Sequence, residues 1–416
     1  MPDYRVIPSI EQLRQRARVQ ALEAVHGRRA TVDALRSEAD AVRVLMQAGE
    51  TLSEAQAETR IVAAAADRLR QQFSGSLRAV INATGVVVHT NLGRAPLGPG
   101  ALERVVSVAR GYANLEYDLA RGVRGSRHGH AEALLTTLTS AEAALVANNN
   151  AAAMLLALAA LAHGREVVIS RGELVEIGGG FRIPDVMAQS GATLREVGTT
   201  NRTRLSDYTA AIHGRTAMVL RVHRSNFRIA GFTEQPSLAA LAATAHERDL
   251  PLVEDLGSGN LVADRAHEPS VAASIAAGAD LVCFSGDKML GGPQAGIVVG
   301  RTALVERLRR HPLMRALRVD KLTLAALEGT LLEYVAGRHD DRVPVMRMIR
   351  MSASPIASRA QALRERLVKN GWSAEIIAGV STVGGGSAPG VELPTMLLAV
   401  ARDGLGPEAL EAQLRA

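Results

Sequence analysis

Short apolar runs separated by helical patterns fill the middle of the chain and restrict its fold most strongly. The helical patterns between them include SLAALAATAHERD and SVAASIAAGA. The apolar runs, which are the expected strands, are ALVANNN, EVVIS, TLREVG, AMVLRV, PLVEDLG, DLVCFSG and AGIVVG. Strands that alternate with helices predict an α/β fold with a mostly parallel central sheet, covered on both faces.

A helical region precedes this core. Residues 9–72 are rich in Ala, Leu, Arg and Glu with helix-like apolar spacing, and His26-Gly27 and Ala48-Gly49 are the expected breaks between helices. Positions 5–36 contain seven arginines but only three acidic residues. The pattern predicts an N-terminal helical domain, residues 1–75, with a basic first half.

Two further domains are expected after it. Residues 79–97 form a β-rich, glycine-punctuated stretch that opens a large α/β domain with expected bounds 76–310. An arginine-rich helical stretch then runs from Gly300 to about His339, and GWSAEIIA and LPTMLLAV follow as expected strands. We assign residues 311–416 to a small C-terminal α/β domain.

Composition excludes several classes of protein. The 416 residues contain no uncharged run of eighteen apolar residues, and the N-terminus lacks the apolar core of a signal peptide. A single cysteine, Cys283, excludes an internal disulfide framework and a multi-cysteine metal site. We therefore expect a cytoplasmic protein that does not enter a membrane, and we predict no metal site.

Lysine is scarce in this basic chain. The formal net charge is +6, yet almost all basic residues are arginine, and the lysines are Lys288, Lys321 and Lys369. A basic balance is a weak indication of a polyanionic partner. Imine chemistry with an aldehyde cofactor needs a lysine amine, so the candidates for such chemistry are few.

Lys288 follows an expected buried strand in DLVCFSGDKMLGGPQAG. An open α/β sheet binds its ligands beyond the carboxyl ends of strands, and glycines let the backbone approach a bulky cofactor. The alternative interpretation is a lysine in an exposed surface loop. The scarcity of lysine and the flanking glycines favour a Schiff base between Lys288 and pyridoxal 5'-phosphate (PLP).

Asp255 ends another apolar run, PLVEDLGSGN. PLP acts as an electron sink when its pyridine nitrogen stays protonated, and a carboxylate holds that proton. Glu254 is the competing carboxylate, but strand alternation directs it to the opposite face. Asp255 could also be a helix N-cap or a turn residue. A strand-end Asp followed by a strand-end Lys matches the fold-type I PLP enzymes.

Five further residues are candidates for cofactor contacts. Asn149, Asn150 and Ala151 lie where a strand passes into an apolar helix, whose N-terminal N–H groups suit a phosphate, together with Ser285. Asparagine is also a common N-cap without any ligand. His223, after AMVLR, either stacks on the pyridine ring or is hydrogen-bonded in a turn, and the spacing does not separate these alternatives.

Together these motifs resemble the bacterial L-seryl-tRNA(Sec) selenium transferases, also called selenocysteine synthases. The resemblance covers nearly all of residues 80–335. Its segments, in chain order, are INATGVVVHTNLGRAPL (81–97), NLEYDLARGVRGSRHGH (114–130), RGELVEIGGGFRIPDVM (171–187), VHRSNFRIAGFTEQPSL (222–238), FSGDKMLGGPQAGIVVG (284–300) and LMRALRVDKLTLAALEGTL (313–331).

The resemblance implies a fold-type I PLP enzyme that makes selenocysteinyl-tRNA(Sec) from seryl-tRNA(Sec) and selenophosphate. In that reaction the seryl amine displaces the lysine to form an external aldimine. Loss of the α-proton and of the serine hydroxyl gives an aminoacrylyl intermediate, to which selenium adds. The resemblance further implies that the N-terminal helical domain binds the tRNA and that the enzyme is a homo-oligomer, a ring of dimers.

Residue roles also follow from the resemblance. Lys288 matches the PLP lysine, and Asp287 matches an acid that assists catalysis. Arg94, Arg315 and Arg318 match arginines that line the pocket for the anionic selenium donor. Guanidinium groups suit phosphate-like oxyanions because they stay charged and present a fork of donors.

Family members usually continue beyond GGGSAPGVELPT with more strands and a helix, so we expect a shortened small domain. One alternative function is a PLP-dependent lyase or transferase that acts on a small amino compound without tRNA. Relatives of that kind can lack or shorten the N-terminal helical domain, which this chain has in full. Another is a tRNA-binding or assembly protein without catalysis, against which the intact Lys288, Asp255 and arginine set argues.

Overall fold

The computed structural model describes residues 3–177, 180–263, 266 and 268–415. Gly178 and Gly179, in the motif RGELVEIGGGFRIPDVM, are outside the described residues. The chain divides into two compact units, Met1–Ile81 and Asn82–Ala416. Each unit has its own hydrophobic core, so each is described by itself.

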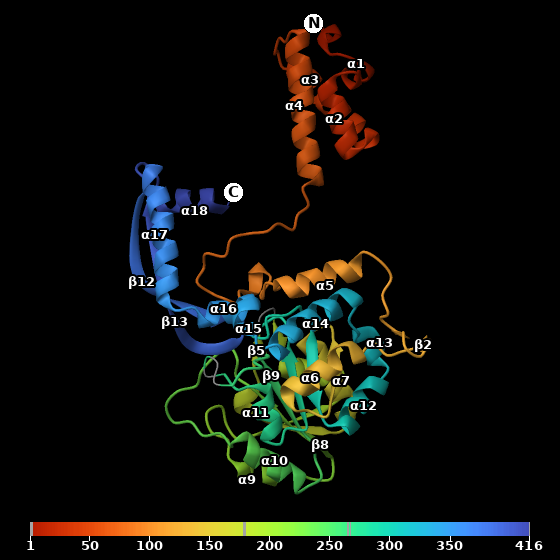
Figure 1. Cartoon of the computed structure of the whole chain (residues 1–416), viewed down its shortest axis with the longest axis vertical. Coiled ribbons are helices and arrows are strands. Elements are labelled where there is room, and N and C mark those ends of the chain that lie inside the picture. The colour runs from red at the N-terminus through yellow and green to blue at the C-terminus, as the bar shows by residue number, and fades with distance from the viewer. Residues whose placement is uncertain (1–2, 178–179, 264–265, 267, 416) are drawn as a thin grey trace. The chain divides into compact units, whose positions relative to one another are not determined.

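The first unit is helical. After a 3-10 turn at Tyr4–Val6 its helices are α1 (Ile10–Arg14), α2 (Ala17–His26), α3 (Arg28–Gln47) and α4 (Glu54–Phe73). Figure 1 shows α3 and α4 side by side, and their buried faces share one apolar cluster with α1 and α2. The prediction of a helical N-terminal region is confirmed, with breaks at Gly27 and after Ala48 as expected.

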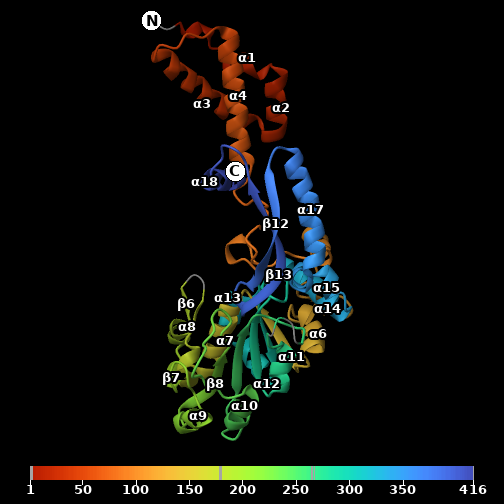
Figure 2. The same cartoon turned by 90° about the vertical axis from the view of Figure 1, so that its left-hand side faces the viewer.

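A seven-stranded sheet is the centre of the second unit (Figure 2). Strand β11 is antiparallel to its neighbours β3 and β10, and the remaining neighbours are parallel. The prediction of an α/β fold with a mostly parallel sheet is therefore confirmed. In spatial order the strands are β3 (Ala143–Ala147), β11 (Gly296–Gly300), β10 (Leu281–Ser285), β9 (Leu252–Gly257), β8 (Thr216–Val222), β4 (Glu166–Ser170) and β7 (Thr193–Val197).

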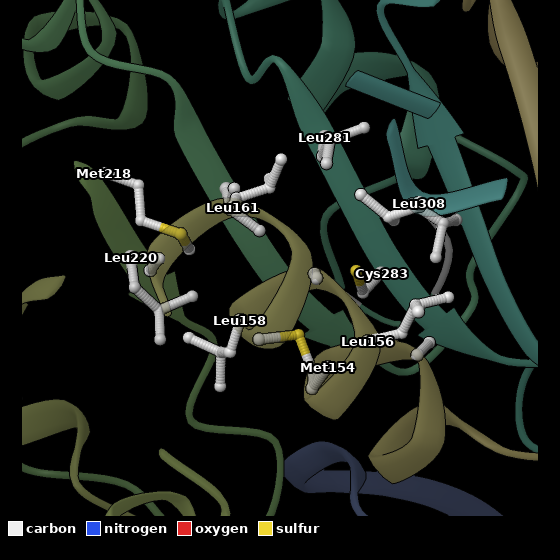
Figure 3. Packing of buried hydrophobic residues seen from close by; sticks show 14 of the residues in the cluster. Met154, Leu156, Leu158, Leu161, Met218, Leu220, Leu281, Cys283 and Leu308 are labelled. Atoms are coloured by element: carbon white, nitrogen blue, oxygen red, sulfur yellow. The ribbon is translucent and has the colours of Figure 1, made fainter. Parts of the chain in front are cut away.

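Side chains of these strands enter two cores in alternation. In β10, Leu281 and Cys283 belong to one apolar cluster, whereas Val282 and Phe284 belong to another, as the two-residue period of a strand requires. Figure 3 shows the first cluster, in which residues of α7 (Asn150–Ala162) meet β8 and β10. Helix α7 is apolar on nearly every side because it packs against the sheet, α8 and α12.

Helices cover both faces of the sheet. One face carries α7, α8 (Ile183–Ser190), α12 (Thr302–Arg310) and α13 (Leu313–Leu317). The other carries α6 (Gly129–Thr139), α9 (Leu205–Ala211), α10 (Leu238–His246), α11 (Val271–Ala276) and α14 (Lys321–Val335), against which α5 (Pro99–Ala109) packs. None of the helices in the described ranges is long and apolar enough to cross a membrane.

Several short elements join these layers. They are the strand pairs β1 (Tyr117–Asp118) with β2 (Val123–Arg124) and β5 (Glu176–Ile177) with β6 (Phe181–Arg182), and the 3-10 turns Thr90–Leu92 and Arg171–Glu173.

The C-terminal part of the second unit contains a long hairpin. Its elements are α15 (His339–Arg342), α16 (Pro344–Arg350), α17 (Ala353–Lys369), β12 (Ser373–Gly384), β13 (Ser387–Ala401) and α18 (Pro407–Arg415). Helix α17 packs against both strands. The hairpin turn consists of glycines with positive φ, Gly384 to Gly386, and a Cβ at Gly384 would lie 2.1 Å from Val86 Cγ1. The turn therefore needs glycine for both its backbone and its packing.

The prediction that residues 79–97 are β-rich is wrong. They form no named strand, because local hydrogen bonds compete with a ladder: Asn82 Oδ1 accepts from the Thr84 N–H at 3.1 Å. The segment nonetheless pairs briefly with β12, since the Val87 N–H donates to Thr382 O at 2.9 Å and the Val88 N–H to Val383 O at 2.8 Å.

Truncation of Leu156 in α7 tests the importance of the first cluster. Leu156 is fully buried, so Leu156→Ala should lower the free energy of unfolding by about 2–5 kcal/mol through lost burial and a residual cavity. Urea denaturation monitored by circular dichroism measures this. Leu414→Ala, at a 74% exposed position in α18, is the control and should change stability by less than about 0.5 kcal/mol.

Candidate active site

Lys288 lies in the turn that follows β10, and it is only 5% exposed. Its Nζ is 3.4 Å from the Gly386 carbonyl oxygen in the hairpin turn. Burial lowers the pKa of the Lys288 ammonium, and the nearby Asp255 carboxylate offsets this only in part. The amine is therefore poised to lose its proton more readily than an exposed lysine, which is the condition for a nucleophile.

Asp255 lies near the end of β9, next to β10 in the sheet, and is also buried. Its Oδ1 accepts a hydrogen bond from Asn150 Nδ2 at 2.7 Å. Burial raises the pKa of Asp255, against the opposing effects of Asn150 and Lys288. Burial likewise raises the pKa of Glu254, an effect that Ser274 of α11 opposes, so the adjacent carboxylates have different environments.

The backbone of Gly257 lies close to both the Asp255 carboxylate and the Lys288 amine. A Cβ at this position would lie 3.7 Å from Asp255 Oδ1, 3.8 Å from Lys288 Nζ and 3.9 Å from Ser225 Oγ. These side chains therefore border one small space above the Gly257 backbone. Its φ of +71° also favours glycine, so conformation and space both restrict this position.

His223 follows β8 directly and is linked to Asp255 through the backbone. The His223 N–H donates to Asp255 O at 2.9 Å, while His223 Nε2 lies 3.0 Å from Glu268 Oε1. Glu268 is buried, and its Oε2 accepts from the Ala388 N–H at 3.0 Å. The imidazole thus has a carboxylate neighbour that is itself fixed to the hairpin.

The predicted phosphate residues lie at the start of α7 and the end of β10. Asn149 caps the helix by accepting from the Ala152 N–H at 2.9 Å, whereas Asn150 is directed to Asp255. Ala151 and Leu317 both line an apolar pocket of about 400 Å³. Ser285, 5% exposed, ends β10 three residues before Lys288. Among the described hydrogen bonds, only that of Asn150 joins one of these predicted residues to Asp255.

Arg94 and Asp287 form an ion pair beside Lys288. Arg94 Nη1 donates to Asp287 Oδ2 at 2.8 Å, and the Ala95 N–H donates to Asp287 O at 3.2 Å. Arg94 has a φ of +60°, an unusual conformation for a residue with a side chain. The electrostatic effect of Arg94 on Lys288 is a further, smaller cause of the lowered pKa of Lys288.

Arg315 and Arg318 lie at α13, whose end is held to the end of β3. Both are exposed at α13, and Arg318 Nη1 is 3.8 Å from Glu116 Oε1, which also pairs with Arg127. The Asn148 N–H donates to Leu317 O at 2.9 Å, which holds the end of α13 to the end of β3. Within the described ranges, no hydrogen bond or ion pair joins either arginine to Lys288 or Arg94.

The structure adds Ser225, Glu268 and the glycines Gly257 and Gly386 to the surroundings of Lys288. The run EDLGSG and the triple glycine before Ser387 were the available signals, since each marks a place of close backbone approach. Glu268 carried no signal in the sequence, because it belongs to none of the motifs named above. No group of three or more His, Cys, Asp or Glu side chains that could hold a metal ion occurs among the residues with a described position.

Residues 80–416 match the family model described as L-seryl-tRNA selenium transferase. The chain belongs to this family. It is 50% identical to the L-seryl-tRNA(Sec) selenium transferase of Geobacter sulfurreducens, over all of this chain and 92% of that protein. It is 46% identical to the enzyme of the same name from Clostridium botulinum (strain Okra), over 99% and 90% of the two chains. The family resemblance drawn from the six motifs is thus confirmed.

Among solved structures, a D-glucosaminate-6-phosphate ammonia-lyase aligns with a TM-score of 0.59 at 22% identity, over 83% of this chain and 86% of that one. A likeness at this level of identity concerns the fold. That fold is the fold-type I architecture predicted from the strand-end aspartate and lysine.

Removal of the Arg94 charge tests the ion pair. Because the Asp287 side chain is only 8% exposed, Arg94→Gln should leave its carboxylate poorly satisfied and lower the free energy of unfolding by about 1–3 kcal/mol. Arg104→Gln, which breaks a more exposed pair with Glu328, should cost less than about 1 kcal/mol. Urea denaturation at low and high salt compares them, and equal losses in both variants would contradict a special role for the Arg94 pair.

Proposed function

We propose that this chain converts seryl-tRNA(Sec) to selenocysteinyl-tRNA(Sec) with selenophosphate, using PLP bound at Lys288. The observation that carries the proposal is the shared space above Gly257, bordered by a buried amine and a buried carboxylate, in a member of the L-seryl-tRNA selenium transferase family. An amine and a carboxylate are the groups that PLP needs at its aldehyde and at its ring nitrogen.

The residues present fit this cofactor. Asp255 is buried with an amide as its hydrogen-bond partner, and a buried carboxylate is costly without a cation beside it. A protonated pyridine nitrogen would supply that cation. Asn150 Oδ1 is buried without a hydrogen-bond partner, which leaves it available for a donor of a ligand. The N-terminus of α7 would hold the phosphate, with Asn149, Ala151 and Ser285 around it.

When bound, PLP supplies an electron sink for bond cleavage at the α- and β-carbons of an amino acid. Lys288, with its lowered pKa, would accept the α-proton of the seryl group and return it. Asp255 would keep the ring nitrogen protonated, and His223 would lie against the ring with Glu268 fixing its orientation. Serine hydroxyl loss needs an anion-stabilising environment, to which Arg94 would contribute.

Arg94 is the arginine best placed for the selenium donor. Asp287 takes one N–H of its guanidinium and so fixes its orientation, while its other N–H groups make no hydrogen bond to any described residue. Those donors suit selenophosphate oxygens. Arg315 and Arg318 remain predicted ligands of the same anion, and assembly into a ring of dimers and cytoplasmic location remain predictions from sequence.

The helical unit is the proposed tRNA-binding part. Its arginines between residues 1 and 75 fall into two groups. One group, Arg14, Arg16, Arg36, Arg43, Arg60, Arg68 and Arg70, lies within 4.0 Å of a carboxylate. The other, Arg5, Arg18, Arg28 and Arg29, is exposed and has no such partner among the described residues. All four lie in the basic first half, where phosphates could neutralise them.

Replacement of Lys288 tests the reaction. Lys288→Ala should abolish conversion of seryl-tRNA(Sec) in the presence of selenophosphate, because the amine that holds PLP is gone, whereas the exposed Lys369→Ala should retain it. Borohydride reduction of the wild-type holoenzyme followed by peptide mapping should attach the cofactor to Lys288. Attachment to Lys321 would contradict the site.

Neutralising two unpaired arginines tests the tRNA surface. Arg28→Gln/Arg29→Gln should weaken seryl-tRNA binding and reduce the slope of log affinity against log salt by roughly 0.9 for each lost phosphate contact. The matched control, Arg43→Gln/Arg70→Gln, removes the same charge from arginines paired with Asp40 and Asp67 and should have a smaller effect. Equal effects in filter-binding titrations would indicate general electrostatics instead of a defined surface.

A further inference from the structure

A basic pocket that includes His223 in its lining lies beside the candidate active site. It has a volume of about 260 Å³ and is formed by the end of β8 and the segment after it, by Ala266 and Glu268, and by the first residues of β13. Its charged and polar lining consists of Arg221, Arg224, Arg228, His223, Gln235 and Glu268. We refer to it as the arginine pocket. Arg224 and Arg228 lie in the segment 222–238 that carries part of the family resemblance, but the chemistry at Lys288 gives these arginines no role.

Arg221 is already neutralised. Its Nε lies 3.3 Å from Glu173 Oε1, and Glu173 is completely buried. Glu173 also accepts from the Val222 N–H at 3.0 Å and from Gln235 Nε2 at 2.6 Å. Arg221 is therefore part of a hydrogen-bonded network around Glu173, and its charge is balanced within that network.

Arg224 and Arg228 have no carboxylate partner in the described part of the chain. Arg224 is half-buried, and its Nη2 donates to the neutral Gln235 Oε1 at 2.6 Å. Burial lowers the pKa of Arg224, which reflects the cost of keeping its charge away from water. Arg228 lies against the bare Gly390 backbone, where a Cβ would be 2.9 Å from its Nη1. Two cations thus converge on one cavity.

The acid in the lining, Glu268, forms no ion pair with Arg224 or Arg228 among the described residues. Glu268 Oε2 accepts from the Ala388 N–H, and its Oε1 faces His223 Nε2 at 3.0 Å. With Arg221 balanced by Glu173, and Glu268 directed to His223 and the hairpin, Arg224 and Arg228 are the charges left for a ligand. Phe227, 37% exposed, and Ile229 add an apolar wall.

We propose that the arginine pocket binds a phosphate group through Arg224 and Arg228, separately from the anion site at Arg94. Two guanidinium groups beside a cavity match the oxygens of a phosphate, and the partial burial of Arg224 strengthens its charge-assisted hydrogen bonds, whereas Arg228 is exposed. The phosphate belongs either to a small phosphate anion or to a phosphodiester of the acceptor end of the tRNA. The second source rests on the proposed function, whereas the phosphate chemistry does not.

Binding of inorganic phosphate to the holoenzyme is the first test. Isothermal titration calorimetry is carried out on the Arg94→Gln variant, in which the proposed anion site at Arg94 is disabled. Arg224→Gln and Arg228→Gln should each weaken phosphate binding by about tenfold or more, because each loses a charge-assisted contact. Arg224→Lys should recover part of the loss. The control Arg248→Gln, an exposed arginine after α10, should leave the affinity unchanged.

The salt dependence of seryl-tRNA binding separates the two sources. If the phosphate is part of the tRNA, Arg224→Gln should reduce the salt slope by roughly 0.9. Weaker phosphate binding with an unchanged salt slope supports a small phosphate anion. Unchanged phosphate affinity and unchanged salt slope in both variants would overturn the proposal. Failure of the chain to convert seryl-tRNA, with phosphate binding that still depends on Arg224, would count against the proposed function alone.

Discussion

The burial of two opposite charges around Gly257 is the constraint on which the site depends. Asp255 lies near the end of β9, and Lys288 follows the neighbouring parallel strand β10, so the sheet brings both to one edge. Burial shifts the pKa of each group toward its neutral form, and neither makes a direct ion pair that would relieve this. Such an arrangement is stable when the surrounding sheet is rigid and when a ligand supplies the missing charge between them.

The C-terminal hairpin is the second requirement. Its glycine turn contacts Lys288 through the Gly386 carbonyl, and the following Ala388 N–H holds Glu268, which in turn faces His223. The segment 85–88 pairs with the same hairpin, and Arg94 from the next turn holds Asp287. Segments from three distant parts of the sequence therefore meet at Lys288, and a shift of the hairpin would change the lysine, the histidine and the arginine pocket together.

Arginine has different roles in different places. In the helical unit most arginines pair with acids on the same or a neighbouring helix, and exposed pairs of this kind contribute little stability. Arg221 supports a buried carboxylate, Arg94 orients an aspartate, and Arg224 and Arg228 lack any acidic partner within the described ranges. The local environment, and not the residue type, decides which arginines are available to phosphate groups.

The sequence by itself determined the alternation of strands and helices, because period-two and helix-period patterns of apolar residues are local properties. Lysine scarcity and the strand-end position also singled out Lys288 and Asp255. Tertiary structure decided what sequence spacing does not contain. It directed Asn150 to Asp255, turned residues 79–97 into a turn-rich segment, and placed Arg315 and Arg318 at α13, without a hydrogen bond or ion pair to Arg94 among the described residues. It also brought Glu268 and Gly386 to the site, since contacts between distant segments depend on how the hairpin packs against the sheet.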